Sequence, residues 1–205
     1  MDKPPTYKAV SEEIRAIFPV LYRAFEEATA KAKDYFVNQG RPIDWQLYPD
    51  LVRYEAKVLL VRAGHDAQYE MEELSRNGLM AVFFGYPTRI RKADNGTVPL
   101  PGNSQPYMGH LNQQAWLSLD GERKWNLMAL WDTTTLGLLS SIKLALTASA
   151  TKTSVENYWI ETIPHPAAAQ QPPTPPAEGK TEVEREDIDI GPAASERDER
   201  ADEGK

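Results

Sequence analysis

The chain has 205 residues, a formal net charge of -7 and no cysteine. The absence of cysteine excludes disulfides, thiolate metal sites and a cysteine nucleophile, and it fits a reducing compartment. No apolar run approaches the roughly 20 residues of a membrane span, and the first residues lack the layout of a secretory signal, so we expect a cytoplasmic protein with no membrane partner.

Composition divides the chain near residue 166. Residues 1–166 contain all the aromatic side chains and are almost neutral, and this length is sufficient to bury one hydrophobic core. From Ala177 onward, 11 acidic and five basic residues account for six of the seven net negative charges. We therefore predict one globular domain over 1–166, followed by a disordered tail over 167–205 that is first Pro-rich and then acidic.

The first part of the domain, over 8–76, has helical patterns. Apolar residues spaced by three and four predict an amphipathic helix over Ser11–Asn38, with its first residue as the N-cap. Pro19 predicts either a kink or the start of a new helix, because proline lacks a backbone donor. A second helix is predicted from Pro49 to Gly64, and the acidic stretch Asp66–Asn77 is also compatible with a helix.

Strand patterns follow, over 79–163. The predicted strands are Leu79–Tyr86 extended through Thr88–Lys92, Ala115–Leu119, Lys124–Asp132, Leu138–Thr147 and Val155–Ile163. Asp94-Asn95-Gly96 predicts a hairpin turn, whereas Val98–Tyr107 contains too many prolines and glycines for a regular element. Short connections predict an antiparallel meander of about five strands. Two or three N-terminal helices packed on this sheet place the protein in the α+β class.

A basic stretch on the first predicted strand is the clearest candidate binding site. Alternation places Arg89 and Arg91 on one face of the strand and Lys92 on the other. With Tyr107 and His110 nearby in sequence, these cations predict a site for phosphate or a nucleic-acid backbone. The competing interpretation is a solvated edge strand, because a nucleic-acid-binding domain usually has an excess of basic residues.

One catalytic alternative uses Asp94, Glu122 and Lys124. Their order matches a nuclease-like pattern in which two carboxylates hold Mg²⁺ and the lysine stabilises charge on the phosphoryl group. Two observations weaken this interpretation: Glu122 and Lys124 flank a predicted tight turn, and Glu55-Ala56-Lys57 matches the same triplet. The three histidines are scattered, and no local pattern predicts a metal or cofactor.

The sequence therefore favours a non-catalytic interaction or regulatory protein that binds another macromolecule, in the first instance another protein. A nucleic-acid-binding protein that uses Arg89, Arg91 and Lys92 is the first alternative. A metal-dependent hydrolase or nuclease is the second.

Overall fold

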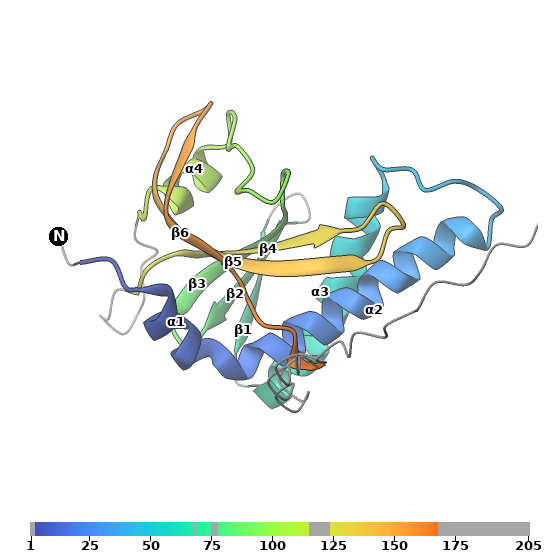
Figure 1. Cartoon of the computed structure of the whole chain (residues 1–205), viewed down its shortest axis with the longest axis horizontal. Helices are drawn as coiled ribbons and strands as arrows, with labels where there is room; N and C mark the ends of the chain where they lie inside the picture. The colour runs from blue at the N-terminus through green and yellow to red at the C-terminus, as the bar shows by residue number, and fades with distance from the viewer. Residues whose placement is uncertain (1–2, 68, 75–77, 115–123, 168–205) are drawn as a thin grey trace, which may run out of the picture. The chain divides into compact units, whose positions relative to one another are not determined.

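The protein was analysed as a computed structural model, which describes residues 3–67, 69–74, 78–114 and 124–167. Within these ranges, four α-helices, a 3₁₀ turn and a six-stranded sheet confirm the predicted α+β class (Figure 1). The predicted strand Ala115–Leu119 and the tail from residue 168 onward lie outside the described residues. None of the helices in the described ranges is long and apolar enough to cross a bilayer.

The N-terminal helices are α1 (Tyr7–Ile14), the 3₁₀ turn η1 (Arg15–Ile17), α2 (Phe18–Val37) and α3 (Tyr48–Ala67). Pro19 lies in the first turn of α2, where a missing backbone donor costs nothing, so the alternative of a new helix beginning there is confirmed. Ser11 is not the N-cap, because α1 begins one turn earlier. The Thr6 hydroxyl caps it and accepts a hydrogen bond from the amide of Ala9.

The strands are β1 (Glu70–Leu74), β2 (Gly78–Phe83), β3 (Tyr86–Lys92), β4 (Leu127–Thr133), β5 (Leu139–Ala150) and β6 (Val155–Thr162). They lie in the sheet in chain order, and every neighbouring pair is antiparallel except β3 and β4. The sheet is therefore mixed and has six strands. The parallel pair arises because the chain crosses the sheet through α4 (Gln105–Leu111) before it enters β4.

The helical prediction for Asp66–Asn77 is wrong, because β1 lies within it. Tyr69 is buried and Met71 packs against the core two residues later, which is the period of a strand rather than of a helix. Pairing of β1 with β2, in which Met71 is opposite Ala81, overrides the helical preference of the glutamates.

The predicted run Leu79–Lys92 is two strands rather than one. Phe84 and Gly85 both have positive φ angles, 49° and 84°, and form the tight turn between β2 and β3. The predicted turn at Asp94-Asn95-Gly96 is present, but it closes a single bridge between Asp94 and Thr97 rather than a strand hairpin.

The sheet has a different cover on each face. On one face, α1, α2 and α3 pack over a large core that contains Phe25, Ile90 and Trp131, while the other face carries α4 and a smaller core around Tyr107, Met128 and Leu130 (Figure 1). Because β4 and β5 carry core residues on both faces, they lie at the centre of the molecule. Arg89 and Arg91 belong to the α4 face.

Candidate functional site

Arg89 is the predicted site residue whose position is most constrained. Its side chain is only 7% exposed, and its Nη2 donates a hydrogen bond to the carbonyl oxygen of Pro106 at 3.1 Å. The guanidinium also lies 5.7 Å from the ring centroid of Tyr107. These contacts attach the start of α4 to β3, so the structure gives Arg89 a packing role, and little of its charge faces solvent.

Arg91 and Lys92 remain closer to the surface. The Arg91 guanidinium lies 4.4 Å from the Tyr107 ring centroid, whereas Lys92 Nζ lies 5.6 Å from the ring of Trp45, in the loop before α3. Alternation along β3 explains why two adjacent cations reach different aromatic rings. Arg53 of α3 adds a third positive charge: burial, and then the charge of Arg91, lowers the pKa of Arg53, which is paired with Asp50.

Tyr107 and His110 are residues of α4, and both side chains are buried. Burial raises the pKa of Tyr107 to about 12, although the charges of Arg91 and Arg89 act in the opposite direction. Burial lowers the pKa of His110 to about 4; a hydrogen bond to the Leu127 carbonyl opposes this shift, and the charge of Arg89 adds to it. Both side chains are therefore neutral at pH 7. Neither presents a charged group to an anion.

The end of α4 is fixed to the sheet by amide side chains that the sequence did not single out. Asn126 Nδ2 donates to the carbonyl oxygens of His110 and Gln114, both at 3.1 Å. Gln113 accepts from the Asn126 amide at 2.7 Å and donates to the carbonyl oxygens of Asn126 and Thr147. These bonds add partners for carbonyls at the helix C-terminus, beside the backbone amide of Gln113 that also donates to His110. The end of α4 is therefore fixed to the sheet by hydrogen bonds, which is a structural role.

The described members of the nuclease-like pattern are not brought together. Lys124 lies against Gly85 at the start of β3, and its Nζ donates to Glu13 at 2.8 Å. Asp94 follows the other end of β3, roughly 20 Å away by strand length. Glu122 lies outside the described residues. Among those that are described, no three His, Asp or Glu side chains are grouped to hold a metal ion.

A second surface, which the sequence did not predict, lies where the α2–α3 loop meets the β4–β5 turn. We define the end surface as four large apolar side chains that are 45%, 41%, 66% and 40% exposed: Trp45, Leu47, Leu136 and Leu138. Figure 1 shows the β4–β5 turn beside the start of α3. The Tyr48 hydroxyl joins the two segments by donating to the Gly137 carbonyl at 2.7 Å.

The end surface is held in a defined shape. The ring of Trp45 lies 5.4 Å from that of buried Tyr48. In the opposite segment, the hydroxyl of Thr134 accepts from the amides of Leu136 and Leu138, both at 3.3 Å. The apolar side chains are thus presented by an ordered loop and turn. Little in the sequence indicates this surface: Trp45 and Leu47 fall between the two predicted helices, and Leu138 begins a predicted strand.

Comparison with known proteins assigns neither a family nor a function to the chain. The chain matches no protein-family model, no curated protein sequence and no solved structure.

Proposed function

We propose that this protein is a non-catalytic interaction protein that binds another protein through the end surface. The observation that supports this proposal is the exposure of Trp45, Leu47, Leu136 and Leu138 on two segments held together by Tyr48. Contiguous exposed apolar side chains on a folded protein are typical of interaction sites, and tryptophan is enriched among residues that dominate binding energy.

Charge at the edge of the end surface indicates the type of partner. Lys92 lies over Trp45, so it places a positive charge at the rim of the end surface. A partner with an apolar centre and carboxylates at its rim would complement this arrangement. Among the described residues, Asp94 and Lys124 lie beyond opposite ends of β3, so their placement does not favour the nuclease-like alternative.

Nucleic acid is the second candidate partner. The stacking of Arg91 on Tyr107 and of Lys92 on Trp45 supports it, because single-stranded nucleic acids bind surfaces where cations alternate with aromatic rings. The burial of Arg89 argues against it, because it leaves fewer cations for phosphates.

The test is quantitative capture from an extract of the native cells with the full chain and two double variants. Trp45→Ser with Leu136→Ser removes the centre of the end surface, whereas Tyr54→Ser with Leu100→Ser removes equally exposed apolar side chains elsewhere. The identified partner is then purified, and its affinity for each form is measured by calorimetry. We expect the end-surface variant to bind at least about tenfold more weakly, since two central side chains are lost, and the control to bind normally.

Equal affinity for both double variants would refute the end surface as the binding site. Repeating the capture after nuclease treatment separates the two candidate partners. A partner lost on nuclease treatment, with affinity that falls steeply with salt, would replace the protein-binding proposal with the nucleic-acid one.

A further inference from the structure

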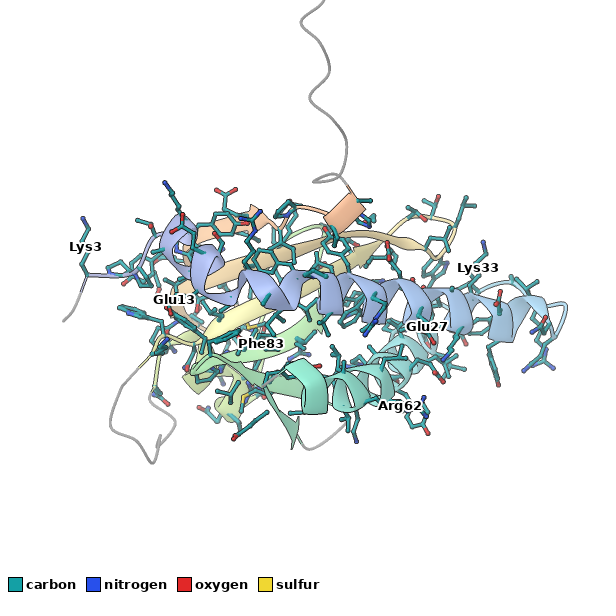
Figure 2. The ribbon with its side chains drawn as sticks, turned by 90° about the horizontal axis from the view of Figure 1, so that it is seen from below. Lys3, Glu13, Glu27, Lys33, Arg62 and Phe83 are labelled. Atoms are coloured by element: carbon teal, nitrogen blue, oxygen red, sulfur yellow. The ribbon has the colours of Figure 1, made fainter. Side chains whose placement is uncertain are left out.

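A hollow lies between α2 and α3, roughly 20 Å along α3 from the end surface. We call it the α2–α3 groove. It has a volume of about 320 Å³, close to the lower limit of ordinary small-molecule sites. Its lining residues come from the first half of α2 and the second half of α3: Val20, Arg23, Ala24, Glu27, Leu59, Arg62 and Ala63. Figure 2 shows Glu27 and Arg62 on these two neighbouring helices.

The groove has an apolar base and charged walls. Ala24 and Ala63 are small, so the two helices leave space between them, and Val20 and Leu59 provide aliphatic surface beside that space. The polar and apolar parts of the lining are of similar extent. A ligand that fits this lining therefore needs both an apolar portion and a charged group.

The groove carries positive charge that is not neutralised by an ion pair among the described residues. Glu27 is already paired with Lys31, whose Nζ lies 2.8 Å from its carboxylate and 3.6 Å from that of Glu55. Over the described ranges, neither Arg23 nor Arg62 makes an ion pair with a carboxylate. Two arginines from opposite helices thus line a common hollow, and Glu27, the carboxylate in the same lining, is paired with Lys31.

We propose that the α2–α3 groove binds a small amphipathic anion, namely a carboxylate attached to an aliphatic chain. The carboxylate would lie between Arg23 and Arg62, because guanidinium donors bind carboxylates through paired, charge-assisted hydrogen bonds. The aliphatic chain would lie on Val20 and Leu59. This site is independent of the end surface, and it would make the protein a carrier or sensor of such acids.

The test uses the full chain with 1-anilinonaphthalene-8-sulfonate, a fluorescent probe with an apolar body and one anionic group. We expect saturable binding of one probe per chain, displacement by decanoate, and at least tenfold weaker displacement by decanol, which has the same chain length without the charge. Displacement by decanoate and decanol at equal concentrations would overturn the proposal.

Variants then locate the site. Arg23→Gln with Arg62→Gln is expected to weaken decanoate binding at least tenfold, whereas Arg15→Gln with Arg41→Gln, which removes the same charge from exposed positions outside the groove, leaves it unchanged. Ala63→Leu keeps both arginines but fills the groove, so it too should abolish decanoate binding while the thermal transition is retained. Unchanged binding in the Arg23/Arg62 variant, or in Ala63→Leu, would refute the assignment.

Discussion

Burial of His110 gives the stability of the protein a defined dependence on pH. The side chain is 1% exposed, and burial lowers its pKa from 6.5 to about 4. As pH falls below 6.5, the unfolded chain takes up the proton first, so the native state loses stability down to a pH near 4. Between pH 7.0 and 4.5 this one group should cost roughly 2 to 3 kcal/mol.

The substitution His110→Gln isolates this contribution. Glutamine keeps an N–H that can donate to the Leu127 carbonyl, but it has no proton to gain between pH 7 and 4.5. Urea denaturation followed by tryptophan fluorescence at pH 7.0 and 4.5 gives the free energy of unfolding for both proteins. The wild-type protein should lose roughly 2 to 3 kcal/mol more than the variant over this interval, since carboxylate titration is common to both.

The same reasoning makes a direct spectroscopic prediction. In the folded protein, the proton resonances of the His110 ring should not titrate above pH 5, and the His110→Gln spectrum identifies which resonances they are. An equal loss of stability in both proteins, together with a His110 pKa near 6.5 by NMR, would refute the claim that this imidazole is held neutral by burial.

Three further perturbations test other parts of the structure. Gly137 and Gly40 both have positive φ, +71° and +62°, and a Cβ at Gly137 would be crowded only by the flexible end of Ile43, at 2.7 Å, so Gly137→Ala and Gly40→Ala should each destabilise by about 1 kcal/mol; a much larger loss at Gly137 would show that Ile43 cannot move aside. Asn126→Leu removes two hydrogen bonds to carbonyls at the end of α4 and should cost about 1 to 2 kcal/mol in urea denaturation; a loss below about 0.5 kcal/mol would show that these bonds do not fix α4 to the sheet. Burial raises the pKa of four tyrosines to about 12: Tyr48, Tyr69, Tyr86 and Tyr107. Because the unfolded chain ionises these four side chains first, stability should fall as pH rises from 10 to 12, and their share of the tyrosinate absorbance should appear with unfolding rather than before it.

The parts of the fold that were predicted correctly are those fixed by local pattern. Apolar spacing identified the long N-terminal helices, and Pro19 marked the start of α2 because proline is tolerated only in a first helical turn. Alternating and apolar runs identified β4, β5 and β6. The class follows from this order of helices and strands.

The errors arise where a long-range contact overrides a local preference. No regular element was predicted over Val98–Tyr107, yet α4 begins at Gln105 within this stretch. Pro106 occupies the first turn of the helix, which Arg89 and Asn126 fix to the sheet. The strand β1 is rich in glutamate but pairs with β2. The parallel contact of β3 with β4 depends on the crossover through α4, which no local pattern contains.

Local sequence patterns were also insufficient to predict the candidate sites. Sequence alternation correctly separated Arg89 and Arg91 from Lys92, but it gave no information on the burial of Arg89. The end surface combines Trp45 with Leu136, which are distant in the chain and meet only because Tyr48 reaches Gly137. Exposure of apolar side chains is a property of the folded chain, so composition could not reveal it.

The single parallel pairing has a consequence for how the chain assembles. It divides the sheet into two half-sheets, β1–β3 and β4–β6, each built from strands that are neighbours in sequence. Forming their shared boundary closes the whole segment between residues 92 and 127, and this long closure should be the slow step of folding. Gly102 is exposed with φ +55° within that segment. A chain cleaved there would separate the half-sheets without breaking either one, and we expect the two fragments to recombine when mixed.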